Sequence, residues 1–412
     1  MLKNCIIVGG GIIGLSSAYY LQKDGHQVTV IDQGDISGGA SFVNAGYITP
    51  SHFIPLAAPG MITQGIKYMF DTSSPFYMKP SLDKNFIKWV LLFGRSCTKK
   101  NVEKNAQPIL EFNLFSQKMF RELKTSNDFD FQLEHKGLLM AFQNLEVGKH
   151  EAEIAEKAIE MGLKIDKLSK DQLAELEPNL IANGAFHYHS DSHTTPSEFM
   201  EAMKKYLKKS GVVFKLNEEV LEIKNSDKEI EITTKKGKYN FDEVVIATGS
   251  WTDKIAKKLN QYIPVQAGKG YAINSFRTTG ISYPTILSEA KVAVTPMDGF
   301  TRFAGTMELA GLDNKINKKR VIAIANTAKR YYRNFEFNQQ EIAKATFGFR
   351  PVSPDGMPFI GRLDKFKNIT IATGHAMMGW SLGPGTGKLV SEIISEKKLS
   401  FDLNPFHPNR KL

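Results

Sequence analysis

The stretch at residues 4–14 reads NCIIVGGGIIG, an apolar run that leads directly into the pattern G-x-G-x-x-G. The apolar run predicts a buried strand at residues 4–8, and the apolar spacing after the glycines predicts a helix over residues 13–23. A second strand is predicted at residues 27–31, and it ends on Asp32. This order of strand, glycine turn, helix, strand and acid is typical of a dinucleotide-binding unit.

Each residue type in this unit has a physical task in binding a dinucleotide. Gly9 permits the tight turn, Gly11 lets a pyrophosphate approach the backbone, and Gly14 lets the helix pack closely on the sheet. The N-terminus of the helix presents unpaired N–H groups and a partial positive charge to the phosphates. The carboxylate of Asp32 suits a ribose diol and disfavours a 2′-phosphate, which argues against NADP. The expected contacts of the dinucleotide are Gly9, Gly11, Ile12, Ile13, Gly14, Asp32 and Gln33.

Three further segments favour FAD over NAD as the dinucleotide. GGAS at residues 38–41 follows Asp32 after a short turn, and both FDEVVIATG at 241–249 and ITIATGH at 369–375 read as a strand that enters a glycine turn. Together these segments resemble the FAD signature of the glutathione-reductase-like flavoproteins. A helix predicted to begin near Gly383 would direct its N–H dipoles at the pyrimidine carbonyl of a flavin. The expected FAD contacts in and beside these segments are Ala40, Ser41, Asn44, Ala45, Gly46, Val220, Ala247, Thr248, Gly249, Trp251, Gly374, Met378, Gly379 and Trp380.

Further motifs extend along most of the chain. They are ASFVNAG at 40–46, KGY at 269–271, RFAGTME at 302–308 and GFRPVSPDG at 348–356. Together they resemble the bacterial FAD-dependent D-amino acid dehydrogenases of the small-subunit type, within the D-amino acid oxidase and glycine oxidase superfamily. The resemblance implies an α/β fold: a discontinuous, glutathione-reductase-like Rossmann FAD-binding domain with a second, mixed-sheet substrate domain of α+β type.

The same resemblance implies that D-amino acids are oxidised by hydride transfer from the substrate Cα to flavin N5, which leaves an imine. A guanidinium binds a carboxylate through two parallel hydrogen bonds, and Arg350 stands in the motif where the family carries the arginine that holds the substrate. Tyr271, His375 and His52 are further candidates for contact with the substrate or the flavin. The alternatives are structural: an ion pair for Arg350, an interior strand position for Tyr271, a capping role for His375 and a place outside the pocket for His52.

Three segments depart from the family pattern. His52-Phe53 stands where the better-known members carry small or aromatic residues, residues 71–134 do not align with the pattern, and HYHSDSH at 187–193 is rich in histidine. D-Proline or 4-hydroxy-D-proline therefore stands beside the broader class of D-amino acids as a predicted substrate. His187, His189 and His193 alternate as on one face of a strand, but with no cysteine and only Asp191 beside them they do not predict a metal site.

The composition is that of an ordinary globular chain of 412 residues, 42% of them hydrophobic and 23% charged. It excludes a disordered or collagen-like protein, and the two cysteines, Cys5 and Cys97, cannot form a disulfide framework. Without a signal peptide or a run of about 18 apolar residues, the chain is predicted to be cytoplasmic. The net charge of +10 comes from scattered lysines and does not indicate nucleic-acid binding.

Residues 61–93 combine aromatic side chains such as Tyr68, Phe70 and Trp89 with lysines such as Lys67. This combination raises the prospect of a peripheral contact with the inner face of a membrane, and the favoured alternative is a lid or a helix packed inward. The family resemblance implies a quinone or another carrier as the electron acceptor. The sequence leaves the oligomeric state open.

The FAD motifs lie at both ends and in the middle of the chain. We therefore expect an FAD-binding domain that comprises residues 1–50, 196–262 and 345–412. The expected substrate domain comprises residues 51–195 and 263–344. The tail from Phe401, with Pro405 and Pro408, is predicted to be a loose terminus.

Two rival functions fit part of the pattern. One is an amino acid oxidase of the same fold, of the glycine or sarcosine oxidase type, which would use oxygen as acceptor. The other is a non-catalytic FAD-binding assembly factor, against which Arg350 and the pocket motifs argue. The C-terminal half holds no cysteine, which excludes a flavin thioether there.

Overall fold

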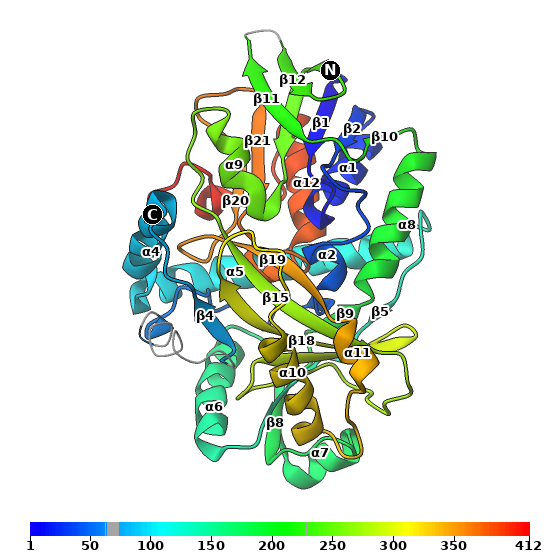
Figure 1. Ribbon diagram of the computed structural model, residues 1–412, viewed down its shortest axis with the longest axis vertical. Coiled ribbons are helices and arrows are strands. Elements are labelled where there is room, and N and C mark those ends of the chain that lie inside the picture. Colours follow the sequence, from blue (N-terminus) through cyan, green and yellow to red (C-terminus); the bar gives the residue numbers. More distant parts are fainter. Residues whose placement is uncertain (62, 64–73, 227–228) are drawn as a thin grey trace.

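The computed structural model describes residues 1–61, 63, 74–226 and 229–412, and these residues build two large sheets (Figure 1). The N-terminal sheet lies in the upper half of the view. Its strand order is β10 (Val213–Lys215), β2 (Gln27–Ile31), β1 (Asn4–Val8), β14 (Glu243–Ile246), β21 (Ile369–Thr373) and β20 (Phe359–Arg362). Neighbouring strands are parallel, except that β20 runs antiparallel to β21.

The N-terminal sheet is buried on both faces, as expected for parallel strands with continuous apolar runs. One face packs on the helices α1 (Ile12–Lys23), α8 (Pro196–Lys209) and α12 (Gly383–Ile394). The other face packs on α9 (Thr252–Lys257) and on a small antiparallel sheet of β11 (Val220–Asn225), β12 (Ile230–Thr234) and β13 (Lys238–Phe241). The strands predicted at residues 4–8 and 27–31 are confirmed, and α1 begins one residue before its predicted start.

The second large sheet, the mixed sheet, occupies the lower half of Figure 1. Its order is β19 (Thr346–Val352), β15 (Gln266–Ser275), β18 (Phe300–Leu309), β17 (Val292–Met297), β16 (Thr285–Leu287), β6 (Leu138–Phe142), β8 (Gly184–Tyr188) and β7 (Ile165–Ser169), with β4 (Phe76–Met78) paired to β18. A smaller sheet joins β3 (Tyr47–Ile48), β9 (Ser192–Thr194) and β5 (Leu133–Glu134). The remaining helices are α2 (Ala40–Val43), α4 (Lys84–Ser96), α5 (Lys99–Thr125), α6 (Leu145–Glu160), α7 (Lys170–Leu176), α10 (Lys318–Tyr331) and α11 (Gln339–Ala343), with short 3₁₀ turns η1 (Gly249–Trp251), η2 (Ala376–Met378) and η3 (Asn404–Phe406). The α/β fold class with a second mixed sheet is confirmed.

The predicted division into two domains stays a prediction, but two elements cross it. Strand β19 lies in the segment 345–412 that was assigned to the FAD-binding part, yet it pairs along its length with β15 of the mixed sheet. Helix α5, assigned to the substrate part, packs against α12 beside the N-terminal sheet, where Gly385 contacts Ser116. The two sheets are therefore joined by more than loops.

Glycines set the position of α12. A Cβ atom on Gly387 would lie 2.4 Å from the backbone carbon of Ser16 in α1, and one on Gly385 would lie 2.8 Å from Cβ of Ser116 in α5. A Cβ atom on Gly383 would lie 2.5 Å from the side chain of Ile12. The absence of these side chains lets α12 approach both helices closely and brings its N-terminus to the glycine turn after β1.

The described part of residues 61–93 packs inward through its largest side chains. Trp89 and Phe93 of α4 are fully buried and stack with their ring centroids 5.0 Å apart. The indole Nε1 of Trp89 donates a hydrogen bond of 3.0 Å to the backbone oxygen of Val352. Lys67, Tyr68 and Phe70 lie outside the described residues. Over the described ranges, no helix has both the length and the apolar character needed to cross a membrane.

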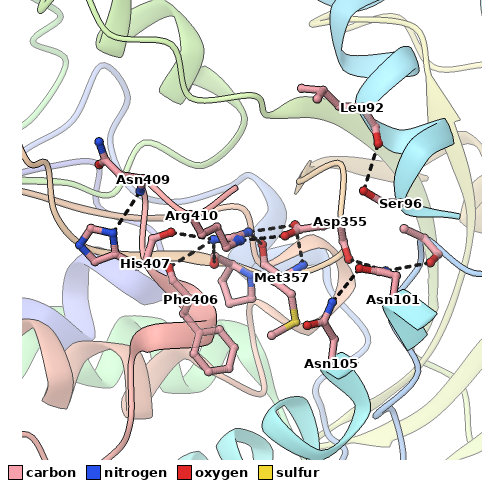
Figure 2. Close-up of polar contacts among 12 residues, drawn as sticks. Leu92, Ser96, Asn101, Asn105, Asp355, Met357, Phe406, His407, Asn409 and Arg410 are labelled. Carbon is pink, nitrogen blue, oxygen red and sulfur yellow. Dashed lines mark hydrogen bonds and ion pairs between the residues drawn. The ribbon is translucent and has the colours of Figure 1, made fainter. Parts of the chain in front are cut away.

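The prediction of a loose C-terminal tail is wrong. Phe406 is fully buried against Phe112 of α5, and Figure 2 shows the guanidinium of Arg410 facing the carboxylate of Asp355. Arg410 Nε and Nη2 donate to the two carboxylate oxygens at 2.7 and 2.9 Å. Asn101 joins this cluster by donating to the backbone oxygen of Asp355 at 3.2 Å. The tail is therefore fastened to the turn that follows β19.

Candidate active site

A cavity of about 440 Å³ lies at the carboxyl ends of β1, β2 and β14 and reaches β15 and β19 of the mixed sheet. Ligands of open α/β sheets bind at this edge, beyond the carboxyl ends of the parallel strands. Most of the residues predicted to bind FAD line the cavity: Gly9, Gly11, Ile12, Ile13, Asp32, Gln33, Ala40, Ser41, Asn44, Val220, Ala247, Thr248, Gly249, Trp251, Gly379 and Trp380.

The glycine turn after β1 leaves no room for side chains. Gly9 has φ +106°, and a Cβ atom there would lie 2.5 Å from the backbone oxygen of Ala247. A Cβ atom on Gly14 would lie 1.9 Å from the backbone oxygen of Gly9, so Gly14 shapes the turn although it does not line the cavity. Gly11 caps α1 without a side-chain hydrogen bond, and the N–H of Ile12 donates to the hydroxyl of Ser41 at 2.9 Å, so Ser41 lies at the helix N-terminus where a phosphate would bind.

Asp32 is held in place at the end of β2 by the backbone. Its two carboxylate oxygens accept hydrogen bonds from the N–H groups of Gly10 at 2.7 Å and Gly34 at 2.8 Å. Each oxygen retains a further acceptor position, and the residue lines the cavity. The arrangement fits a ribose diol, and with the side-chain-free glycine turn it fits a dinucleotide such as FAD.

Arg350 of β19, in the mixed sheet, also lines the cavity. Its Nη1 donates a hydrogen bond of 2.6 Å to the backbone oxygen of Thr306. In the described part of the chain no carboxylate forms an ion pair with it, and burial alone lowers the pKa of its guanidinium to about 10. A buried cation that has no acidic partner and lines a cavity is suited to an anionic ligand.

Tyr271 of β15 is among the residues that line the cavity, but its ring packs in the apolar core of the mixed sheet and its hydroxyl is used within the protein. The hydroxyl donates to Oε2 of Glu308 at 2.9 Å and accepts from the backbone N–H of Asn317 at 3.3 Å. Burial and the adjacent carboxylate raise its pKa. Glu308 is in turn within 3.8 Å of Lys269 and 3.1 Å of Arg320. The phenol is therefore part of a buried network of polar and charged groups.

His375 lines the cavity and is almost fully buried. Its Nε2 lies 3.0 Å from the hydroxyl of Thr386 in α12. Burial lowers the pKa of His375 to about 3, so the imidazole is neutral at physiological pH. Trp380 is fixed by the bond from its Nε1 to the hydroxyl of Thr194, at 2.9 Å.

The remaining predicted residues do not line the cavity. They are His52, Gly14, Ala45, Gly46, Gly374 and Met378. His52 lies beside the Ser51 hydroxyl at 3.0 Å, and burial lowers its pKa to about 4. Met378 packs into an apolar cluster with Phe112, and its neighbour Met377 reaches the cavity instead.

The cavity residues that were not predicted include Gly270, Phe349 and Lys254. Gly270 and Phe349 lie in the KGY and GFRP motifs, so these motifs could have identified them as site residues. Lys254 is one of many scattered lysines.

The histidine-rich segment is used structurally. The rings of His187 and His189 lie 4.2 Å apart, His187 Nε2 contacts the backbone oxygen of Lys136 at 2.9 Å, and His189 Nε2 contacts Asp166 at 2.7 Å. Over the described ranges, no group of three or more histidine, cysteine, aspartate and glutamate side chains could hold a metal ion.

Comparisons with known proteins agree with this geometry. A D-amino acid dehydrogenase of Vibrio atlanticus (strain LGP32) is 32% identical over 403 residues, which cover 95% of this chain and 95% of the relative. One of Neisseria gonorrhoeae (strain NCCP11945) is 30% identical over 405 residues, with 95% of each chain covered.

Solved structures extend the likeness to the fold. Glycine oxidase from Geobacillus kaustophilus matches with a TM-score of 0.79 and 21% identity, covering 100% of this chain and 99% of that one. L-Proline dehydrogenase from P. horikoshii matches with a TM-score of 0.71 and 20% identity, covering 99% and 97%. At these identities the solved structures show the fold alone.

The sequence model of the family described as DAO, FAD dependent oxidoreductase, matches residues 4–393, which is nearly the whole chain. The expected resemblance, enzyme class and cofactor are therefore confirmed. The chain belongs to the DAO family of FAD-dependent oxidoreductases.

Proposed function

We propose that this enzyme oxidises D-amino acids at the bond between Cα and nitrogen, with Arg350 holding the substrate carboxylate. The observation that carries the proposal is the buried guanidinium of Arg350, which lines the cavity without an acidic partner in the described part of the chain. The curated relatives named D-amino acid dehydrogenase, at 30% and 32% identity over nearly full length, support the D configuration.

The residues that would hold FAD are the glycine turn, Asp32 and the turn from Thr248 to Trp251, all of which line the cavity. When bound, FAD supplies an acceptor for the hydride of the substrate Cα. Arg350 contributes by fixing the carboxylate through a planar fork of N–H groups, which also fixes the orientation of Cα.

Among the described residues of β15 and β19 that line the cavity there is no carboxylate and no histidine. The acids that line the cavity are Asp32, Asp35, Glu218 and Glu219, which belong to the turn after β2 and the approach to β11. His375 has a pKa of about 3 and is too weak a base to take a proton from an ammonium group at neutral pH. We infer that the substrate amine is oxidised in its neutral form, to an imine that water hydrolyses to an oxo acid when the amine is primary.

Cyclic amines remain within this proposal. Trp251 and Phe349 line the cavity, with ring centroids 5.8 Å apart in an edge-on arrangement. An apolar wall of this kind suits the ring methylenes of D-proline or 4-hydroxy-D-proline, whose oxidation would leave a cyclic imine. These substrates are proposed beside acyclic D-amino acids.

We propose a quinone as the electron acceptor, reached by peripheral contact with a membrane. Leu82, just before α4, and Ile87 and Leu91 on α4 are exposed apolar side chains beside the exposed Lys84 and Lys88. Apolar side chains flanked by lysines favour the surface of an anionic bilayer. Flotation with vesicles that contain anionic lipid should capture the wild-type enzyme, and it should capture a variant with all three apolar side chains changed to serine much less.

An anaerobic mixing experiment tests the proposed reaction. The holoenzyme is mixed with D-alanine, L-alanine, D-proline, cis-4-hydroxy-D-proline or glycine, and the visible flavin absorbance is followed. We expect the D-amino acids to bleach it and L-alanine to leave it unchanged. Bleaching by L-alanine alone, or by none of these compounds, would contradict the proposal. Oxygen uptake measured beside reduction of a soluble quinone then separates a dehydrogenase from an oxidase.

A further inference from the structure

The pairing of β15 with β18 is interrupted by a bulge beside Arg350. Thr306 and Met307 of β18 stand opposite the single residue Gly270 of β15. Thr306 has φ +70°, in the left-handed region, which glycine ordinarily occupies in a bulge of this kind and which is strained for a β-branched residue. Backbone strain of this type persists only where the surrounding structure requires it.

The guanidinium of Arg350 lies across this bulge. Arg350 on β19 is paired with Gly268 of β15, and its side chain extends over Gly270 toward β18. A Cβ atom on Gly270 would lie 2.2 Å from Nη1 and 2.5 Å from Cζ of Arg350. Nη1 donates to the backbone oxygen of Thr306 at 2.6 Å. One bulge therefore supplies both the space and the hydrogen-bond acceptor for the guanidinium.

The strands around the bulge are held firmly on both sides. Before the bulge β18 pairs with β17, as in the register of Ala304 with Ala293, and after it β18 pairs with β4, as in the register of Glu308 with Tyr77. The bulge therefore lies where β18 exchanges one partner strand, β17, for another, β4. The Thr306 carbonyl is directed toward β19, where it accepts the hydrogen bond from Arg350 Nη1.

We propose that the bulge of Gly270 and Thr306 is a positioning device for Arg350. Gly270 provides a surface without a side chain, and the Thr306 carbonyl binds one amino group, which leaves Nη2 and Nε to bind a carboxylate in the cavity. Gly270 and Thr306 act through Arg350 and do not themselves take part in the chemistry. The inference rests on the proposed function, in which Arg350 holds the substrate carboxylate.

The variant Gly270→Ala tests the device, because the added methyl group must displace the guanidinium. Binding of benzoate, a simple carboxylate, is measured on the holoenzyme through the change in flavin absorbance, and KM and kcat are measured with D-alanine. We expect Gly270→Ala to weaken benzoate binding and to raise KM by about 10- to 100-fold, with the larger effect on KM than on kcat. FAD content should stay at the wild-type level.

The matched control is Gly305→Ala, which adds the same methyl group to the residue before Thr306 on β18. Its added methyl group would meet Val292 at 3.2 Å and Ile324 at 3.3 Å, and not Arg350. We expect wild-type benzoate affinity and KM from this variant. Equal losses in both variants would mean that Gly270 has a general packing role, and would overturn the inference.

The variant Arg350→Leu separates failure of the inference from failure of the proposed function. If Arg350→Leu leaves benzoate binding unchanged, the carboxylate assignment itself fails. If Arg350→Leu weakens binding and Gly270→Ala does not, the positioning device is refuted. The double variant should bind benzoate no more weakly than Arg350→Leu alone, because Gly270 acts through the guanidinium.

The double variant also keeps the test valid if Gly270→Ala does not fold. Replacing Arg350 with leucine removes the guanidinium with which the new methyl group collides. Recovery of a folded, FAD-containing protein in the double variant would therefore support the inference. Failure of the double variant to fold would show that Gly270 is needed for another reason and would overturn it.

Discussion

The substitution Arg350→Leu removes the fork of N–H groups that we assign to the substrate carboxylate. Nη1 is engaged by the Thr306 carbonyl, so Nη2 and Nε remain for two parallel hydrogen bonds. Hydrogen bonds to charged groups contribute about 1.5–3 kcal/mol each, which sums to about 3–6 kcal/mol. At about 1.4 kcal/mol per factor of ten, kcat/KM for D-alanine should fall by about 10²- to 10⁴-fold.

Folding stability should respond differently from catalysis. The guanidinium is buried without an acidic partner among the described residues, so its removal eliminates an uncompensated buried charge. We expect the urea midpoint of Arg350→Leu to equal or exceed that of the wild type, with FAD content unchanged. Arg350→Lys keeps a positive charge and loses the planar fork, so its kcat/KM should lie between the two.

Steady-state kinetics with a soluble electron acceptor measure these effects, and anaerobic reduction of the flavin measures the reaction step directly. Arg277→Leu is a suitable control, because Arg277 is a half-exposed arginine bound to Glu341, away from the cavity. A fall in kcat/KM of less than about tenfold for Arg350→Leu, below the value of a single charge-assisted bond, would refute the carboxylate assignment. So would an equal fall in the Arg277 control.

Three further predictions concern stability and its dependence on pH. Arg410→Ala leaves the buried carboxylate of Asp355 without its cation and should lower the free energy of unfolding by about 3–5 kcal/mol, whereas the exposed Lys411→Ala should change it by less than about 0.5 kcal/mol; urea denaturation compares them. Gly387→Ala adds a methyl group 2.4 Å from the backbone of α1 and should lower stability by about 1–3 kcal/mol, seen as a lower Tm. The pKa of His375 falls from 6.5 to about 3 on folding, so the unfolded chain binds the extra proton and stability is lost as pH falls below 6.5; His375→Gln should remove up to about 1.4 kcal/mol per pH unit of this loss between pH 6.5 and 5. Equal pH slopes in wild type and His375→Gln would contradict the last prediction.

The glycine turn could be predicted from the sequence because its requirements are local. Gly9 and Gly14 are demanded by backbone contacts within one strand–turn–helix unit, and the acid at the end of the next strand follows from the same unit. Local steric rules were therefore sufficient to predict the glycine turn and the acid at the end of β2. The predicted strand bounds at residues 4–8 and 27–31 agree with the structure for the same reason.

Predictions that needed the direction of a side chain were less reliable. Met378 was expected at the cavity. In the short turn η2 it is the neighbouring residue, Met377, that lines the cavity, whereas Met378 packs into the core. His52 was a candidate for contact with the substrate or the flavin, yet it does not line the cavity. The C-terminal tail carries two prolines that suggested disorder, whereas its anchors, Phe406 and Arg410, bind residues far earlier in the chain. No local pattern reports contacts of such long sequence separation.

Strand β19 links the turn after β14, where we propose that FAD binds, to Arg350, which we propose holds the substrate. The hydroxyl of Ser250, in the turn that would hold FAD, donates to the backbone oxygen of Phe349 at 3.2 Å. Arg350 is the next residue along β19, and Trp89 binds the Val352 carbonyl two residues later. Displacement of the turn after β14 would therefore move the backbone beside the guanidinium. Arg350 thus lies on a strand that belongs to the mixed sheet and also contacts the N-terminal unit. In the proposed function, the distance between a bound carboxylate and the cofactor would then be set by a short backbone path and not by the packing of two separate bodies.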